Sequence, residues 1–372
     1  MTLQPLAERI LGSRALAALT SPHGVDRYLE LVNPMWAATE VRARVVDITR
    51  ETSGEHPVAT LTLQPTSTWR GHRAGQYVQV GVEINGARRT TRCFSISSAE
   101  SGPGERFTIT VRAHEEAEPG QQRVSRFLVR EAQPGQVVHL SQAQGEFTLT
   151  ESPATPTNNH LLMISGGSGI TPVMSQIRTL LRDGYEGKAN RKVTFLHYAR
   201  SEEDQIFADE LRRIQWEDNH VDVHLKYGDD VFSAESLARL VPDFRDTDTW
   251  ACGPGPMMEL IHAAYDGSPR LRSEYFKLAT AVGAGSGAAE GDLSFTRAGR
   301  SAANTGTSIL EQAEAAGLTP EYGCRMGICF SCVSRKTDGT VRNVLTGEES
   351  SMPDEDIRIC VSAPVGDCAV DL

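Results

Sequence analysis

YGCRMGICFSC, residues 322–332, is the most decisive stretch of this chain, because it brings three cysteines into one short loop. Cys324, Cys329 and Cys332 lie in the loop, and Cys360 follows after 27 further residues. Thiolates are soft ligands, and four of them satisfy two tetrahedral iron ions that share two bridging sulfides. A zinc site would instead show two CxxC pairs or Cys/His pairs. The spacing therefore predicts a [2Fe–2S] cluster with these four cysteines as its metal ligands.

Length and charge limit the kinds of protein this chain can be. Its 372 residues exceed one ordinary core, so two or three domains are expected. The net charge of −11 weighs against nucleic acid or an anionic membrane as the main partner. No apolar run approaches the roughly 18 residues of a membrane span, and Glu8, Arg9 and Arg14 interrupt the N-terminal apolar stretch, which argues against a secretory signal. We expect a cytoplasmic protein, peripheral at the inner membrane only through a partner.

Changes of pattern along the chain indicate five segments. Residues 1–36 form an extension with apolar residues at helical spacing. Residues 37–153 contain short alternating strands separated by turns, which is typical of an antiparallel barrel or sandwich. In residues 154–278 apolar strands alternate with helical stretches, which predicts an α/β domain with a parallel sheet. Residues 279–291, rich in Ala, Gly and Ser, indicate a flexible linker, and residues 292–372 form a compact last module.

The last module resembles a known family. Residues 307–310, TSIL, lead through a predicted helix to Gly317 and then to the cysteine loop, and this order closely resembles plant-type ferredoxins. The resemblance implies a β-grasp fold of the α+β class. Phe330 departs from the family, which commonly has a small residue at that position. Cys368 lies outside the ligand set, and we expect it to be a buried thiol of the last strand.

A second resemblance centres on residues 92–95, RCFS, which end a predicted strand. Residues 75–77, GQY, come before this motif and residues 145–149, GEFTL, come after it. Together they resemble the flavin domain of the ferredoxin–NADP reductase superfamily, whose motif reads Arg-x-Tyr/Phe-Ser. The resemblance implies that residues 37–153 form an antiparallel β-barrel that binds flavin.

The same resemblance assigns a role to each residue of the motif. Arg92 would pair with the flavin phosphate, since a planar guanidinium binds two oxygens at once. Phe94 would pack against the isoalloxazine ring or the ribityl chain, and Cys93 belongs to the same cofactor-binding stretch. Ser95 would be a catalytic residue that donates a hydrogen bond near flavin N5, the atom that accepts hydride.

The identity of the flavin rests on two further pairs of residues. Val124 and Ser125 resemble the start of the helix whose N–H groups face the flavin pyrophosphate. Val111 and Arg112, together with that helix, resemble the FAD-type members of the superfamily. FAD is therefore favoured over FMN, and FMN stays open.

A glycine-rich loop predicts the nucleotide site. Residues 164–172, ISGGSGITP, join a buried strand to a helix at the first strand-to-helix turn of the predicted parallel sheet. Glycines let the backbone approach a pyrophosphate, and free N–H groups at the helix start can bind it. The candidate nucleotide-binding residues of this loop are Gly166, Gly167, Ser168, Gly169 and Thr171.

A second loop, CGPGPM at residues 252–257, follows the last predicted strand and resembles the nicotinamide-side motif of the superfamily. The resemblance places Cys252 where the nicotinamide meets flavin N5, as a catalytic residue that acts by its shape. The alternative is an ordinary buried cysteine before a turn. Phe276 is a candidate cover for the flavin face, with a packed aromatic as the alternative. The cofactor-binding candidates of this loop are Cys252, Gly253, Pro254 and Met257.

Arg200 and Ser201 follow a predicted strand at the position that meets the adenosine ribose. An arginine beside a hydroxyl can bind a 2′-phosphate, which favours NADPH. The acidic residues 202–204 come directly after and oppose that preference, so NADH stays open.

The order of the modules indicates an electron path. A nicotinamide gives two electrons as hydride, a cluster takes one, and a flavin can hold either number, so the flavin must stand between them. The whole chain resembles the reductases of actinobacterial membrane acyl-CoA desaturases, including residues 22–29, PHGVDRYL, and residues 33–36, NPMW. The resemblance implies a desaturase as acceptor. Reductase components of ring-hydroxylating, steroid or alkane monooxygenases are the alternative, and a redox sensor without turnover is a hypothesis of another class.

Overall fold

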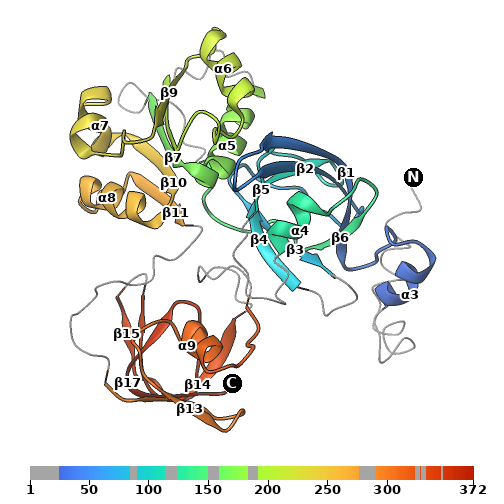
Figure 1. The fold of residues 1–372 in the computed structure, drawn as a ribbon, viewed down its shortest axis with the longest axis vertical. Coiled ribbons are helices and arrows are strands. Elements are labelled where there is room, and N and C mark those ends of the chain that lie inside the picture. The colour runs from blue at the N-terminus through green and yellow to red at the C-terminus, as the bar shows by residue number, and fades with distance from the viewer. Residues whose placement is uncertain are drawn as a thin grey trace. The chain divides into compact units, whose positions relative to one another are not determined.

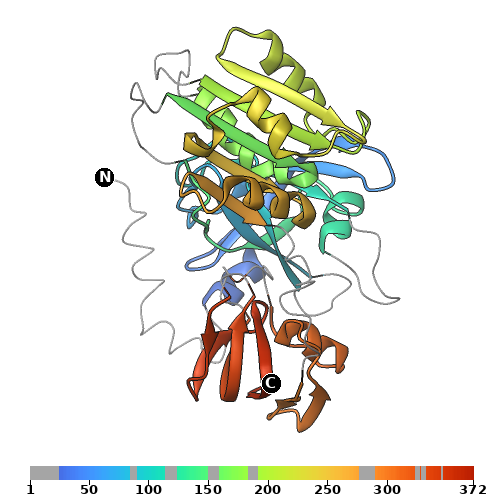
Figure 2. The same cartoon turned by 90° about the vertical axis from the view of Figure 1, so that its left-hand side faces the viewer.

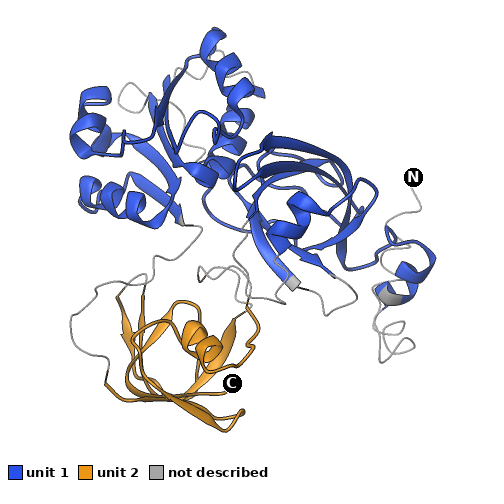
Figure 3. Cartoon of the chain, viewed as in Figure 1, with its two compact units in different colours: residues 1–274 blue, residues 275–372 orange. Residues whose placement is uncertain are grey.

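A computed structural model describes residues 25–83, 90–113, 124–149, 159–182, 192–275, 290–322, 327, 332–344 and 347–372. The chain divides into two compact units, residues 1–274 and residues 275–372 (Figure 3). The predicted linker, residues 279–291, lies almost wholly outside the described residues, as do residues 1–24 of the extension. No helix in the described parts of the chain is long and apolar enough to cross a membrane.

The first unit begins with a six-stranded antiparallel barrel, so the barrel prediction is confirmed (Figure 1). The ends of the sheet meet, because Ile96 bridges Ile109 and the Ser97 N–H donates to the Thr108 carbonyl at 2.8 Å. The alternating apolar residues of the strands fill the interior as expected for a half-buried strand pattern. In sheet order the strands are β4 (Thr90–Ser95), β3 (Tyr77–Val82), β6 (Val137–Leu140), β1 (Val41–Thr52), β2 (Val58–Pro65) and β5 (Phe107–Arg112).

The described part of the extension is helix α3 (Val25–Val32), which ends directly before Asn33 and Pro34. The buried Asp26 carboxylate accepts hydrogen bonds from the N–H groups of Ala38 and Glu40. Backbone hydrogen bonds to the carboxylate lower the pKa of Asp26 although burial raises it. This buried carboxylate therefore attaches α3 to residues 38–40, which lie directly before the first barrel strand.

The second half of the first unit is a five-stranded sheet covered by helices on both faces, α5 and α6 on one and α7 and α8 on the other (Figures 1 and 2). Its central strand β7 lies between β8 and β10 and pairs in parallel with both, so the strand order reverses beside β7. Ligands bind at such a switch point, at the carboxyl ends of the strands. In sheet order the strands are β11 (Leu271–Tyr275), β10 (Asp248–Gly253), β7 (His160–Gly166), β8 (Lys192–Ala199) and β9 (Val221–Tyr227). The helices are α5 (Ile170–Arg182), α6 (Ala208–Trp216), α7 (Ala234–Leu240) and α8 (Gly255–Tyr265).

In its described residues the second unit is a mixed sheet with one helix, α9 (Ile309–Ala315), and it confirms the β-grasp prediction. Ser308 and Glu311 form a capping box that starts α9. Cys368 is buried in the last strand as predicted, and burial raises the pKa of its thiol to about 11. In sheet order the strands are β13 (Arg300–Ala303), β12 (Asp292–Phe295), β17 (Ser362–Val370), β14 (Val333–Asn343) and β15 (Glu349–Ser350), while β16 (Glu355–Arg358) also pairs with β14.

Candidate functional site

The flavin motif occupies the end of β4. Arg92 pairs with Val80 of β3, and its guanidinium donates to the Thr91 carbonyl at 2.9 Å. Cys93 and Phe94 are half-buried, and Ser95, the last residue of the strand, is buried. The motif therefore lies on one barrel strand with only its serine withdrawn from solvent.

Helix α4 (Val124–Arg130) packs against β4 and β5, which brings three more predicted residues to this end of the barrel. Val124 and Ser125 are buried at the helix start, and Val111 is buried in β5. These three residues and the β4 motif are thus brought together by adjacent elements, as the resemblance implied for a flavin site.

Arg112, the neighbour of Val111, lies near the glycine loop. A Cβ added to Gly167 of the glycine loop would lie 3.8 Å from its guanidinium. Burial lowers the pKa of Arg112. The Asp204 carboxylate raises this pKa and the Arg200 guanidinium lowers it, so the three charged side chains lie close enough to interact. Its Nε has no hydrogen-bond partner among the described residues. A buried donor atom of this kind, beside the glycine loop, suits an anionic ligand.

The two predicted nucleotide loops pack directly against each other. A Cβ on Gly169 would lie 2.2 Å from the Cys252 carbonyl oxygen, and one on Gly166 would lie 2.6 Å from the Met257 sulfur and 2.9 Å from Pro254. Only glycine permits this approach. A Cβ on Gly253 would in turn meet the Gly166 backbone at 3.3 Å.

The glycine loop itself is a turn into α5. Residues Gly167–Gly169 form a short 3₁₀ turn in which Gly167 has φ +53°, and Ser168 lies at its centre. The Thr171 hydroxyl donates to the Ser168 carbonyl at 3.0 Å. The loop therefore presents backbone N–H groups at the carboxyl end of β7, which is the geometry that holds a dinucleotide phosphate.

A buried histidine lies behind this loop and was not predicted from the sequence. His197 Nδ1 lies 2.7 Å from the Ser165 hydroxyl, one residue before the glycines. Burial lowers the pKa of His197 to about 3, with Arg112 lowering it as well, so the ring is neutral. Its Nε2 has no hydrogen-bond partner in the described part of the chain. In the sequence His197 is a single histidine in a largely apolar strand, and no neighbouring residue indicates that it lies behind the glycine loop.

A buried acid beside Cys252 is the other residue that the sequence analysis missed. Glu274 is buried in β11, its Oε2 has no partner among the described residues, and burial raises its pKa to about 8. Burial raises the pKa of the Cys252 thiol well above its ordinary value, and Glu274 adds to that shift. Cys252 is thus a neutral thiol, in agreement with a role by shape. Phe276, two residues after Glu274, lies outside the described residues.

Arg200 and Ser201 lie at the end of β8. Arg200 is exposed, whereas the Ser201 hydroxyl donates to the Asp204 carboxylate at 3.3 Å. The backbone N–H of Asp204 donates back to the same hydroxyl at 3.3 Å. A carboxylate bound to Ser201 repels a 2′-phosphate, while Arg200 attracts one, so the predicted position contains opposing charges.

Helix α5 connects the glycine loop to the segment that follows Ser95. The Ser175 hydroxyl donates to the Ser98 carbonyl at 2.6 Å, the Thr179 hydroxyl accepts from the Glu100 N–H at 2.9 Å, and Arg178 donates to the Ser97 carbonyl. One helix thus begins at the nucleotide loop and holds the end of the flavin strand.

The four predicted metal ligands fall partly within the described residues. Cys332 and Cys360 are 2% exposed and their sulfur atoms lie 3.1 Å apart. Both are free thiols, since a disulfide needs about 2.05 Å. Cys324 and Cys329 lie outside the described residues. Two buried sulfur atoms that lie this close together without forming a disulfide fit the binding of one shared metal ion.

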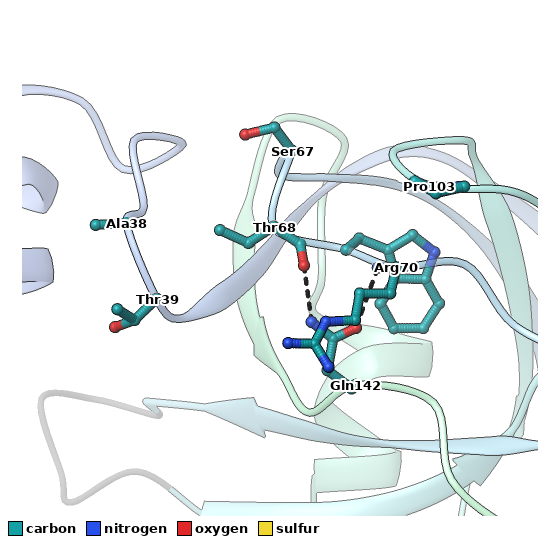
Figure 4. A pocket seen from close by; sticks show the side chains of 8 residues that line it. Ala38, Thr39, Ser67, Thr68, Arg70, Pro103 and Gln142 are labelled. Carbon is teal, nitrogen blue, oxygen red and sulfur yellow. Dashed lines mark hydrogen bonds between the residues drawn. The ribbon is translucent and has the colours of Figure 1, made fainter. Parts of the chain in front are cut away.

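A surface cavity on the barrel shares no residue with these sites. Gln142 spans it, donating to the Thr68 carbonyl at 2.7 Å and accepting from the Arg70 N–H at 3.1 Å (Figure 4). The lining residues are Ala38, Thr39, Ser67, Thr68, Trp69, Arg70, Pro103 and Gln142.

Known proteins match both units. Residues 163–263 match the family described as oxidoreductase NAD-binding domain, and residues 296–365 match the 2Fe-2S iron-sulfur cluster binding domain. An NADPH oxidoreductase of Mycobacterium tuberculosis (strain ATCC 25618 / H37Rv) is 36% identical over 98% of this chain and 94% of its own length. The glycine betaine monooxygenase reductase subunit of Pseudomonas aeruginosa (strain UCBPP-PA14) is 28% identical over 90% of this chain and 96% of its own.

A solved structure shares the fold over nearly the whole length. Phthalate dioxygenase reductase, described as a modular structure for electron transfer from pyridine nucleotides to [2Fe-2S], superposes with a TM-score of 0.58 at 22% identity. The match covers 89% of this chain and 97% of that one. The chain therefore belongs to the family of NAD(P)H-dependent oxidoreductases that join an NAD-binding domain to a C-terminal 2Fe-2S iron-sulfur cluster binding domain.

Proposed function

We propose that this enzyme carries electrons from NAD(P)H through FAD and the [2Fe–2S] cluster to an oxygenase-type acceptor protein. Residues 37–153 hold FAD, residues 154–278 hold the nucleotide and residues 292–372 hold the cluster, with residues 279–291 as linker. The observation that carries the proposal is the joining of the glycine loop and the end of the flavin strand by α5, within one compact unit. The reduction potential of the cluster and the access of an acceptor protein to the second unit then determine which protein receives the electrons.

The chain's own residues bind and orient the two organic cofactors. Arg92 and the start of α4 bind the flavin phosphates, and Phe94 packs against the flavin. Arg112 and the glycine loop bind the nucleotide pyrophosphate, because the unsatisfied Nε of Arg112 lies there. Flavin supplies the conversion of a two-electron hydride into single electrons.

Three residues prepare the place where the rings meet. Ser95 donates a hydrogen bond near flavin N5. Cys252 supplies a small, neutral wall against the nicotinamide. Glu274 holds a proton at neutral pH beside Cys252, because its pKa is raised to about 8. A site lined by neutral groups excludes water. Without water the hydride passes to the flavin and is not lost by reaction with solvent protons.

We propose NADPH as the reductant. Arg200 is exposed at the end of β8 and attracts the 2′-phosphate. The name of the 36% identical relative, an NADPH oxidoreductase, supports this choice. Comparing kcat/KM for NADPH and NADH tests it, and a clear advantage for NADH would reverse the assignment.

The acceptor is the finer part of the proposal. The resemblance of residues 22–29 and 33–36 supports a membrane acyl-CoA desaturase, which would keep the enzyme on the cytoplasmic side. The name of the glycine betaine monooxygenase reductase subunit supports a soluble oxygenase component instead. Reconstituting NADPH oxidation with a desaturase in vesicles and, separately, with an oxygenase component separates the two.

One anaerobic experiment tests the electron path. Purified protein mixed with NADPH is expected to lose its flavin absorbance first and then to show the paramagnetic signal of a reduced [2Fe–2S] cluster. It should also reduce cytochrome c with turnover. Protein that contains both cofactors but shows no turnover would be the redox sensor, and protein without the cluster signal would contradict the proposed path.

A further inference from the structure

Arg358, the last residue of β16, lies next to the predicted cluster site in the strand pairing and in the sequence. It pairs with Val333, the residue directly after the ligand Cys332, and it precedes the ligand Cys360 by two positions. Its guanidinium donates a hydrogen bond to the carbonyl of Gly327, which lies between Cys324 and Cys329 in the ligand loop. The half-buried Arg358 side chain therefore contacts the loop between the first two predicted ligands, while its backbone lies beside the residues that follow or precede the other two.

Gly327 has little freedom at this contact. Its φ is +73°, and an added Cβ would lie 2.8 Å from the Val361 side chain. The residue therefore packs against Val361 and accepts a hydrogen bond from the Arg358 guanidinium. This hydrogen bond fixes where the Arg358 guanidinium lies.

Other cations of the same hairpin are directed to carboxylates. Arg335 lies 3.1 Å from Asp356, Lys336 lies 3.7 Å from Glu355, and Arg342 lies 3.1 Å from Glu349. The Arg358 guanidinium contacts the ligand loop, residues 323–331, at Gly327, and that loop contains no Asp or Glu in its sequence.

Charge arithmetic gives this contact a consequence. Two ferric ions, two sulfides and four thiolates sum to a net charge of roughly −2, and one added electron makes it roughly −3. An arginine keeps its charge at all working pH values. In a partly buried, low-dielectric place it stabilises the more negative form.

We propose that Arg358 is a positioning residue that holds the cluster loop and raises the reduction potential of the cluster. The inference rests on the [2Fe–2S] site of the proposed function. The step it affects is the transfer of one electron from reduced flavin to the oxidised cluster, with no proton moved and no bond made or broken at Arg358. A higher cluster potential draws that electron out of the flavin and makes its return less favourable.

The test is an EPR-monitored redox titration of the full-length holoprotein. Arg358→Gln and Arg358→Met remove the charge and are expected to lower the cluster potential, where a tenfold weaker hold on the electron is about 59 mV for a one-electron couple. Arg335→Gln is the matched control, because Arg335 lies on the same hairpin and pairs with a surface carboxylate. Its potential is expected to equal that of the wild type.

The loop contact has its own readout, the rate of iron release to a chelator. Arg358→Lys keeps the charge but loses the planar guanidinium contact, so its potential should stay near the wild-type value while iron is released faster. An unchanged potential in Arg358→Gln with a full cluster overturns the inference. If neither neutral variant keeps its cluster, Arg358→Lys decides: a cluster at wild-type potential supports the inference, and a lost or shifted one overturns it. A wild-type protein without the cluster signal would instead overturn the proposed function.

Discussion

The two units treat charge in opposite ways. Around the glycine loop and Cys252 in the first unit, the buried titratable groups are neutral: His197 has its pKa lowered to about 3 and Glu274 has its pKa raised to about 8. Around the cysteine loop in the second unit a charged group makes the contact instead, because the Arg358 guanidinium donates to the Gly327 carbonyl. A hydride acceptor site benefits from a dry, neutral wall, whereas an anionic cluster benefits from nearby positive charge.

The largest effect should come from removing a cluster ligand. Cys360→Ser is expected to abolish cytochrome c reduction through the cluster while NADPH still bleaches the flavin, because the two functions lie in different units. Stopped-flow absorbance and iron analysis measure both. Cys368→Ser is the control, since that thiol is buried outside the ligand set. A Cys360→Ser protein with a normal iron content would contradict the assignment of Cys360 as a cluster ligand.

Gly169→Ala should damage the first unit alone. The new Cβ would stand 2.2 Å from the Cys252 carbonyl oxygen, so one of the two loops must move. A displacement of about 1 Å at a hydride-transfer site lowers the rate of flavin reduction by about 100-fold. Gly102→Ala is the control, because its Cβ would meet only the Glu105 side chain at 3.5 Å. Equal flavin reduction rates in the two variants would contradict the close packing of the loops.

Glu274 should leave a mark on the pH dependence of stability. Its pKa is about 8 in the folded protein against an ordinary value of 4.5, so the folded state binds the proton more tightly. As pH rises from 4.5 to 8 the unfolded state ionises and the folded state does not, so the wild type loses stability, by at most about 5 kcal/mol at 1.36 kcal/mol per pKa unit. Glu274→Gln lacks this loss.

Thermal unfolding of the two proteins across that pH range measures the effect. The Tm of Glu274→Gln minus that of the wild type is expected to increase steadily toward pH 8. A difference that does not change with pH would show that Glu274 is ionised in the folded protein, and the neutral wall around Cys252 would have to be abandoned.

The smallest effect is expected at the ribose end of the nucleotide. Asp204→Asn removes the carboxylate that opposes a 2′-phosphate, and a partly exposed charge of this kind changes the NADPH-to-NADH ratio of kcat/KM about threefold to fivefold. Glu203→Gln, an exposed neighbour, is the control. A shift toward NADH in Asp204→Asn would mean that the carboxylate does not face the nucleotide.

The antiparallel strands of residues 37–153 and the parallel sheet were predictable, because their strands carry regular apolar periods and their loops carry glycines that few other structures require. The β-grasp module was predicted from its resemblance to plant-type ferredoxins around the cysteine loop. Strand β11 was not predicted, since its sequence LRSEY is mostly polar. Its Glu274 looks like a surface acid until the fold covers it. Arg112 was predicted to be near the flavin from its place beside Val111, and only its side-chain direction shows that it reaches Gly167.

By itself the sequence determined the module order, the four cysteines and the two glycine loops, because these signals are local in the chain and a few adjacent residue types suffice to produce them. The tertiary structure alone decided which distant groups meet: Ser165 with His197, Glu274 with Cys252, and α5 with the segment after Ser95. The physical reason is that pKa values and close contacts depend on burial and on neighbours far away in sequence, and no short pattern encodes either.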